Sequence, residues 1–260
     1  MNEDNLAVLS DDLTIGFTKR AETPVIEGLT LNVRRNEFFV LTGPTGSGKS
    51  TFLRVLAANN ARKDPKILGG DLMVLGRDLG FLIPRARYRL QTQLGYLPQD
   101  GAMLLAPQFT VAENIVLPIT SRDRHWDKTD LSRRVLTLLE QLALPKSLAS
   151  HYPHELSSGQ RQRVALAQSV IFEPKLWLID DPTRGVDVIA REAVLSFITE
   201  RKRSSECTII LATTEPTVLR DLTDRVAVLD EGKLADIGDT ETILTRPQSF
   251  FMQDYLALLD

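Results

Sequence analysis

The chain opens with alternating hydrophobic and polar residues, a pattern typical of β-strands that bury one face. The hydrophobic positions are Leu6, Val8, Leu13, Ile15 and Phe17, followed by Val25, Ile26, Leu29, Leu31 and Val33. Turns are predicted at Thr23-Pro24 and Arg35-Asn36. From Glu37 the order changes to strand, loop and helix, which is typical of an α/β core. The sequence therefore predicts an antiparallel layer of strands that leads into an α/β sheet.

The middle of the chain, residues 107–168, has helical spacing. Thr110 and Glu113 have the spacing of a capping box, and the helix that they begin is expected to end at Pro118. A second helix follows from apolar residues at helical spacing and is expected to end by Pro145. Ser157 and Gln160 form a second capping box before a third helix. The pattern predicts a helical lobe inserted into the α/β core.

The remaining segments complete the predicted core. Residues 61–70 contain Pro65 and the pair Gly69-Gly70, so we expect a surface loop there. Strands are predicted over residues 71–75, 94–97, 176–179, 208–213 and 225–229, and helices over residues 190–201 and from Pro216. We expect one domain over residues 1–260, with a core over about 1–100 and 169–238, a helical lobe over about 101–168, and a short tail over about 239–260 that docks as a small helix.

Composition narrows the class of protein. Hydrophobic residues make up 43% of the 260 residues, enough for a large buried core. The net charge of -3 gives no basic excess, so binding to nucleic acid through a wide positive face has little support. The single cysteine, Cys207, favours a reducing compartment. No stretch of roughly 20 apolar residues and no signal peptide is evident, so we expect any membrane role to come through a partner.

The strongest chemical motif follows the strand that begins at Glu37. Its residues are Gly43-Pro44-Thr45-Gly46-Ser47-Gly48-Lys49-Ser50-Thr51, which match the phosphate-binding loop pattern between a strand and a helix. Gly46 and Gly48 allow positive φ, so backbone N–H groups can turn inward toward the positive end of the helix dipole. Lys49 can reach the β and γ phosphates and Ser50 can ligate Mg²⁺. The alternative, a glycine-rich turn with no ligand, does not explain the complete motif.

A second strand ends in carboxylates. Asp180 and Asp181 follow four apolar residues and therefore emerge at the carboxyl end of a buried strand, where ligands bind in open α/β sheets. Asp180 is the candidate for the magnesium shell, and Asp181 for orienting or deprotonating the attacking water. The alternative is an acidic turn before Pro182.

Another candidate anion site opens the third helix of the predicted lobe. Leu156-Ser157-Ser158-Gly159-Gln160 combines a serine hydroxyl, flexible backbone and a helix N-terminus. Because a whole lobe separates this segment from the phosphate loop, it is suited to a nucleotide held by another subunit. Local physics alone also allows an ordinary capped helix.

Taken together, these motifs resemble the ATP-binding subunit of an ATP-binding cassette (ABC) transporter, over residues 6–238. Phe17 resembles the aromatic residue that stacks on adenine, Gln99 the glutamine of the Q-loop, and Leu156 to Gln160 the family signature. Pro182-Thr183-Arg184-Gly185-Val186-Asp187 resembles the D-loop. The resemblance implies a P-loop ATPase fold, and ATP with Mg²⁺ bound between the phosphate loop of one subunit and the signature of a second. Closure of the pair would then drive integral membrane domains, with the chain peripheral on the cytoplasmic face of the inner membrane.

Two positions depart from the family pattern. Asp181 stands where the family usually has glutamate, and Thr214 stands where it usually has a histidine. An acid displaced by ~1 Å can cost about 100-fold in rate. We therefore expect ATP-dependent closure with slow hydrolysis at this subunit's own phosphate loop. The pair could be a heterodimer, in which this chain's signature completes a partner's active site, or a slowly cycling homodimer. Ser158 replaces the commoner glycine of the signature, which is a mild change.

The sequence says less about the surface that binds the membrane partner and about the substrate. Met103, Leu104, Leu105 and Phe109 lie just after Gln99, where the family receives a coupling helix of the membrane domain; the alternative is that they pack the lobe's own core. Residues 112–118 resemble subunits that handle lipids or the cell envelope, whereas residues 151–156 resemble peptide importers. These two hints disagree. A signalling or assembly subunit with little hydrolysis and no transport role is the other function class.

Overall fold

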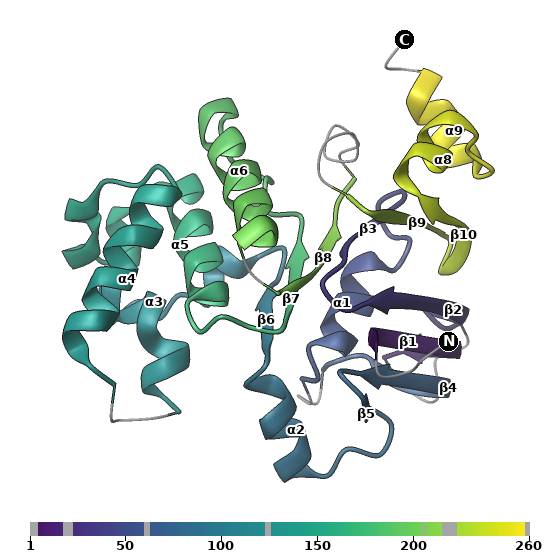
Figure 1. The fold of residues 1–260 in the computed structure, drawn as a ribbon, viewed down its shortest axis with the longest axis horizontal. Helices are drawn as coiled ribbons and strands as arrows, with labels where there is room; N and C mark the ends of the chain where they lie inside the picture. Colours follow the sequence, from purple (N-terminus) through teal and green to yellow (C-terminus); the bar gives the residue numbers. More distant parts are fainter. Residues whose placement is uncertain are drawn as a thin grey trace.

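The computed structural model describes residues 5–17, 23–59, 63–122, 126–204, 206–214 and 223–257. Two sheets and a group of helices make up these residues (Figure 1). The four-stranded sheet lies on one side of the molecule, the helices α3, α4 and α5 lie on the other, and the six-stranded sheet runs between them. This arrangement is the predicted α/β core with an antiparallel layer and an inserted helical lobe.

The four-stranded sheet has the order β2-β1-β4-β5 and is antiparallel. Its strands are β1 (Leu6–Gly16), β2 (Ile26–Arg34), β4 (Lys66–Val74) and β5 (Arg77–Asp78). The prediction of a loop over residues 61–70 is wrong from Lys66 onward. Gly70 has φ +71°, and a Cβ there would lie 2.2 Å from the Asp12 carbonyl oxygen, at a break in the register with β1. The glycine pair therefore serves a bulge within a strand, which its composition does not distinguish from a loop.

The six-stranded sheet has the order β10-β9-β3-β8-β7-β6. All its neighbouring pairs are parallel except β9 with the edge strand β10. The strands are β3 (Phe38–Thr42), β6 (Leu94–Leu97), β7 (Leu176–Asp180), β8 (Thr208–Ala212), β9 (Arg225–Asp230) and β10 (Lys233–Asp239). The sequence predicted β3 and β6 to β9 within a residue or two at each end. It did not predict β10, whose residues are mostly half-buried or exposed.

Strand β3 divides the hydrophobic core in two. Phe38 and Val40 pack into the cluster that includes the helical lobe, whereas Phe39 and Leu41 pack into the cluster that includes the antiparallel sheet. Helix α1 (Lys49–Leu56) joins this second cluster through Phe52 and its neighbours. Because successive side chains of a strand point to opposite faces, a strand buried on both faces reads as one apolar run.

The helical lobe contains α3 (Val111–Thr120), α4 (Lys128–Gln141) and α5 (Ser158–Val170), with short 3₁₀ segments η2 (Gly101–Leu104), η3 (Lys146–Ser150) and η4 (Pro153–Glu155). Both predicted capping boxes are confirmed, at Thr110 with Glu113 and at Ser157 with Gln160. Pro118, however, does not end α3. Its missing N–H leaves the Asn114 carbonyl without a helical donor, and the Gln168 side chain donates to that carbonyl at 2.7 Å instead.

The other helices are α2 (Pro84–Gln91), α6 (Val188–Ser204), α8 (Thr240–Thr245) and α9 (Phe250–Ala257). Helix α2 was not predicted, and the predicted tail helix corresponds to α9. Helix α4 ends at Gln141, four residues before the predicted stop at Pro145, which instead precedes η3. The short helix predicted from Pro216 lies outside the described residues. Within the described residues, no helix has the length and hydrophobicity that crossing a membrane requires.

Candidate functional site

Four parallel strands end side by side and bring the predicted site residues together. In the sheet register, Leu41 of β3 pairs with Ala212 of β8, which pairs with Asp180 of β7. On the other side of β7, Ile179 pairs with Leu97 of β6. The segments that follow these strands carry the phosphate loop, Thr214, Asp181 and Gln99, so all four begin at one edge of the sheet. Ligands bind at this edge in open α/β sheets.

The phosphate loop takes the backbone conformation that its glycines predict. Gly46 and Gly48 have φ +87° and +105°, and Gly43 has φ +136°. A Cβ on Gly43 would lie 1.9 Å from the Leu229 carbonyl oxygen of β9, so only glycine fits there. Gly48 packs against Ile26 of β2 and leads directly into α1, whose start has no side-chain cap among the described residues. The first N–H groups of α1 are therefore available for an anion.

Lys49 is held inside the loop. Its Nζ donates to the carbonyl oxygens of Gly43 and Pro44, both at 2.8 Å, and contacts Ser47 Oγ at 3.3 Å. The side chain is buried, and this burial lowers the pKa of Lys49, while the charges of Asp180 and Asp181 act in the opposite direction. The ammonium group is thus placed where the loop curls, ready to contact phosphate oxygens.

Asp180 and Ser50 form the second part of the site. Ser50 Oγ donates to Asp180 Oδ1 at 3.0 Å, which joins the start of α1 to the end of β7. Burial raises the pKa of Asp180 to about 6, and Asp181 adds to this rise, whereas the Ser50 hydrogen bond and Lys49 oppose it. A hydroxyl and a carboxylate are hard oxygen donors of the kind that Mg²⁺ prefers, and Mg²⁺ usually takes only one or two such protein ligands. The pair therefore fits a magnesium ion that accompanies phosphates.

Asp181 turns away from the strand direction. It has φ +47°, a left-handed conformation that Asp tolerates better than most residues, and its N–H donates to the Ala212 carbonyl at 2.9 Å. The carboxylate is half-buried and close enough to affect the pKa values of Lys49 and Asp180. Thr214 follows β8 and is exposed. The residues just after it, 215–222, lie outside the described part of the chain.

Gln99 and Phe17 lie at opposite sides of this edge. Gln99 is half-buried and comes two residues after Leu97, the residue paired with Ile179. Phe17 is 43% exposed and follows β1. The end of β1 pairs with the start of β2 through Ile15 and Ile26, and Ile26 packs against Gly48. This pairing places the end of β1, and with it the exposed Phe17, on the side of the sheet where β2 contacts the phosphate loop.

The predicted signature segment does not belong to this cluster. Ser157 caps α5, accepting from the Gln160 N–H at 3.2 Å, and both Ser157 and Ser158 are exposed. A Cβ on Gly159 would lie 3.8 Å from the Gly185 carbonyl oxygen, so the signature and the segment 182–187 share one surface. Asp187 has a structural role here, because its Oδ1 accepts from the Ala190 N–H at 3.0 Å near the start of α6.

Tyr96, three residues before Gln99, has a role that the sequence did not indicate. Its hydroxyl oxygen is buried and has no hydrogen-bond partner among the described residues. Burial raises the pKa of Tyr96, and the charge of Asp180 adds to the rise. Tyr96 also lines a groove of about 360 Å³ between the core and the helical lobe, together with Gln91, Pro118, Arg122 and Gln168. No sequence signal marked this position, because the groove exists only after the lobe packs on the core.

Comparison with known proteins places these features in a family. The family model described as ABC transporter matches residues 26–184. The chain is 35% identical to the Fe(3+) ions import ATP-binding protein FbpC of Serratia marcescens over 86% of its length. It is 33% identical to the methionine import ATP-binding protein MetN of Mesorhizobium japonicum over 91% of its length. The chain spans 61% and 62% of the lengths of these two relatives.

A solved structure is similar over nearly the whole chain. A dimeric structure of the ATP-binding cassette MJ0796 with ADP and phosphate matches with a TM-score of 0.80 and 25% identity, covering 90% of this chain and 98% of that one. A cassette from Clostridium perfringens, part of the transporter complex cbiONQ, matches with a TM-score of 0.77 at 22% identity, which supports the fold.

Proposed function

Because the chain belongs to the ABC transporter family, we propose that it is the ATP-binding subunit of a membrane transport complex. It binds ATP with Mg²⁺ and couples dimer closure and ATP hydrolysis to movement of a substrate by membrane partners. The observation that carries this proposal is the cluster of Lys49, Ser50 and Asp180 at the strand ends. The relatives named as import ATP-binding proteins favour transport over a signalling or assembly role.

Each residue of the cluster has a distinct role in this proposal. The loop Gly43 to Thr51 surrounds the phosphates with N–H groups, and Lys49 contacts the β and γ phosphates. Ser50 and Asp180 hold Mg²⁺, which supplies charge stabilisation when bound, with Gln99 beside them. Phe17 stacks on the adenine ring. Asp181 orients or deprotonates the attacking water, and Thr214 occupies the position beside the γ phosphate.

The signature completes a site on a second ATP-binding subunit. Ser157 and Ser158 are exposed at the start of α5, beside the buried Gly159 and the half-buried Gln160. The segment that ends at Asp187 lies against Gly159. Because this surface is separate from the chain's own phosphate loop, it serves a nucleotide held by a partner. The dimeric arrangement of MJ0796 supports this interpretation.

Hydrolysis at the chain's own loop is slow in this proposal. Asp181 is one methylene shorter than the usual glutamate, and a displacement of ~1 Å can cost about 100-fold in rate. Thr214 has no ionisable group, and loss of acid–base assistance costs about 100- to 10,000-fold. Nucleotide binding does not depend on either residue. We propose that this subunit binds ATP as a clamp, and that a heterodimeric partner with a complete site hydrolyses faster.

The test is the steady-state ATPase rate of the purified chain, before and after the paired change Asp181→Glu with Thr214→His. We expect slow turnover for the unaltered chain and an increase of at least about 10-fold for the paired variant. The variant Lys49→Ala, which removes the phosphate contact, should abolish turnover in both backgrounds and identifies contaminating ATPase. Brisk turnover by the unaltered chain would overturn the clamp proposal while leaving ATP binding intact.

The membrane partner is proposed to dock on the helical lobe, at the exposed apolar residues that follow Gln99. Met103 and Leu104, which follow Gln99 closely in the chain, are 84% and 67% exposed. Leu105 is buried in the lobe's own core, so it cannot contact a partner there. Phe109 is half-buried. Gln99, four residues before Met103 in the chain, is the proposed connection from this docking surface to the nucleotide site. This contact would hold the chain at the cytoplasmic face of the inner membrane.

A charge substitution tests this docking site. Met103→Glu places a carboxylate on the proposed interface and should prevent co-purification with the membrane partner, because an unpaired charge is costly to bury. ATP binding should stay unchanged. Met73→Glu, at a half-buried position of the antiparallel sheet away from the proposed interface, is a control that should leave assembly intact. Unchanged assembly of the Met103 variant would contradict the site. The substrate stays open, since similar relatives are named for iron and for methionine.

A further inference from the structure

Helix α2 and the segment before it present apolar side chains to solvent. Phe81, Ile83 and Tyr88 are 84%, 64% and 53% exposed. Leu82, between the first two, instead packs against the core. In Figure 1, α2 projects from the core on the side opposite α8 and α9. Large apolar side chains that cluster on a surface mark an interaction site more often than scattered ones do.

The inward face of α2 is firmly attached to the core, so the outward face has a defined orientation. Leu90 is fully buried, and the side chains of Arg87 and Gln91 donate to the Ala58 carbonyl oxygen at 3.1 Å and 3.2 Å. The exposed residues Arg85, Tyr88 and Arg89 have the spacing i, i+3 and i+4. Residues at this spacing lie on one side of a helix. The outward face therefore combines an aromatic ring with two guanidinium groups.

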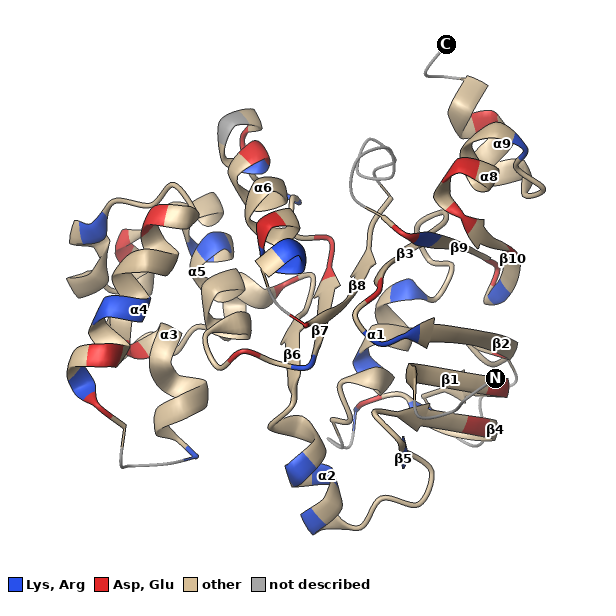
Figure 2. Cartoon of the chain, in the orientation of Figure 1, with Lys and Arg blue, Asp and Glu red and all other residues tan. Residues whose placement is uncertain are grey.

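The charge of this region differs from that of the whole chain. Residues 79–99 contain three arginines and no acidic residue, although the chain has a net charge of -3. Figure 2 shows the Lys and Arg positions on α2 with no Asp or Glu beside them on the helix. Neither Arg85 nor Arg89 forms an ion pair with another described residue. The two cations are thus available for a negatively charged partner.

We propose that Phe81, Ile83, Arg85, Tyr88 and Arg89, here called the α2 face, bind the anionic headgroups of a lipid bilayer. Aromatic and aliphatic side chains enter the headgroup region, and arginines contact phosphates while their stems stay on the apolar surface. Charge complementarity favours anionic lipid headgroups as the ligand of the α2 face. An uncharged apolar protein segment bound there would leave both arginines without a negatively charged partner. Such a contact orients the chain on the membrane independently of any protein partner.

The test uses sedimentation of the purified chain with vesicles. One vesicle contains phosphatidylglycerol and phosphatidylcholine in equal parts, and the other contains phosphatidylcholine alone. We expect binding to the anionic vesicle and little to the neutral one. The variant Arg85→Gln with Arg89→Gln should weaken binding roughly 30-fold, at about 1 kcal/mol or fivefold for each arginine. Raising NaCl from about 0.1 M to about 1 M should also release the chain, since the Debye length falls from about 10 Å to about 3 Å.

Matched variants distinguish binding through the α2 face from a non-specific effect of positive charge elsewhere on the chain. Arg133→Gln with Arg203→Gln removes the same charge from exposed positions on α4 and α6 and should bind as the unaltered chain does. Phe81→Ser with Ile83→Ser should weaken binding while keeping its salt dependence. Equal binding to both vesicles, equal loss in the control pair, or no vesicle binding at all would overturn the proposal. Loss of co-purification with a membrane protein, without vesicle binding, would assign the face to that protein instead.

Discussion

The phosphate loop and the signature are both candidate anion sites, yet the structure builds them differently. The phosphate loop is enclosed by its own chain: Lys49 is buried, Ser50 bonds to Asp180, and Gly43 and Gly48 pack against β9 and β2. The signature has one capping box and exposed serines, and its Gly159 lies near the segment at Gly185. The first site is preorganised within one molecule, whereas the second presents two serines to solvent.

This difference between the phosphate loop and the signature indicates which free energy forms each site. Around the phosphate loop, the chain places the buried charges of Lys49 and Asp180 close together before any nucleotide is bound. Such charges are costly to bury, so folding energy maintains the site. The signature carries no such cost and can gain its interactions only on closure. A binding site that is maintained at a cost and a surface completed by a second molecule together suit a clamp that closes on ATP.

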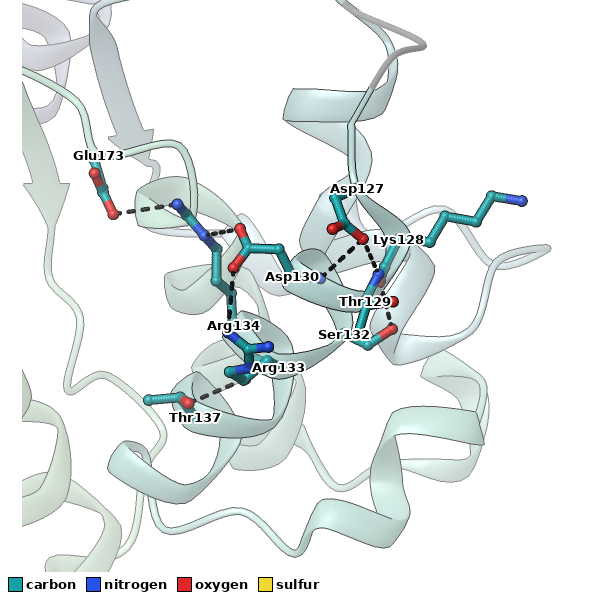
Figure 3. Close-up of polar contacts among 9 residues, drawn as sticks. All are labelled: Asp127, Lys128, Thr129, Asp130, Ser132, Arg133, Arg134, Thr137 and Glu173. Carbon is teal, nitrogen blue, oxygen red and sulfur yellow. Dashed lines mark hydrogen bonds and ion pairs between the residues drawn. The ribbon is translucent and has the colours of Figure 1, made fainter.

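The largest effect should come from a substitution in the exposed signature. Ser158→Glu places a negative charge where a partner's nucleotide would approach, with a repulsion of about 1–4 kcal/mol at 4 Å. We expect ATP-driven dimer formation to weaken by about 10-fold or more, measured by analytical ultracentrifugation. Ser132→Glu on the exposed side of α4 (Figure 3) is the control. A parallel loss of ATP binding by the isolated chain would show that the variant damages the fold instead.

An intermediate effect should follow from removing the buried charge of Asp180 beside the phosphate loop. Because burial raises the pKa of Asp180 from 3.8 to about 6, the folded protein binds more protons than the unfolded chain within this window. Stability therefore falls as pH rises through the window, and the whole penalty is present at neutral pH. Asp180→Asn removes the charge and should raise the free energy of unfolding by about 1–3 kcal/mol without nucleotide, measured by urea denaturation.

The same variant should lose magnesium-dependent nucleotide binding, so stability and function move in opposite directions. Asp71→Asn, on the exposed part of β4, should change neither quantity. A destabilised Asp180→Asn protein would mean that the bond to Ser50 outweighs the burial of charge. The hydrogen bond between Ser50 and Asp180 would then stabilise the fold, and the site would not be maintained at a cost in folding free energy.

The smallest effect concerns contacts that belong to neither half. In Figure 3, Arg134 on α4 contacts Asp130 at 2.9 Å and Glu173 at 3.2 Å, which connects the helical lobe to the turn after α5. These side chains are partly exposed, and such ion pairs contribute about 0–1 kcal/mol. Arg134→Gln should lower the free energy of unfolding by no more than about 1 kcal/mol, a difference that salt should reduce. Arg133→Gln, which removes a longer and more exposed pair with Asp130 at 3.8 Å, should change the free energy of unfolding less. A large change in ATP binding would contradict this ranking.

Local signals predicted much of the fold and the enclosed site. The positive φ of the loop glycines, the two capping boxes and the apolar strands each depend on neighbouring residues, and each was confirmed. The errors arose where distant residues decide the outcome. Gly69-Gly70 became a bulge because β1 lies beside it, and Pro118 stayed within α3 because Gln168 supplies a donor. For Leu105, the sequence left both partner docking and packing in the lobe's own core open, and the structure shows that the lobe buries it.

By itself, the sequence predicted candidate residues for phosphate and magnesium, because a glycine-rich loop before a helix and an acid after an apolar strand have local physical requirements. It did not determine that Ser50 meets Asp180 across 130 residues, or that Tyr96 lines a groove. Nor did it predict α2 with its outward arginines. Those features depend on strand order, register and the packing of the lobe, which only the tertiary structure decides.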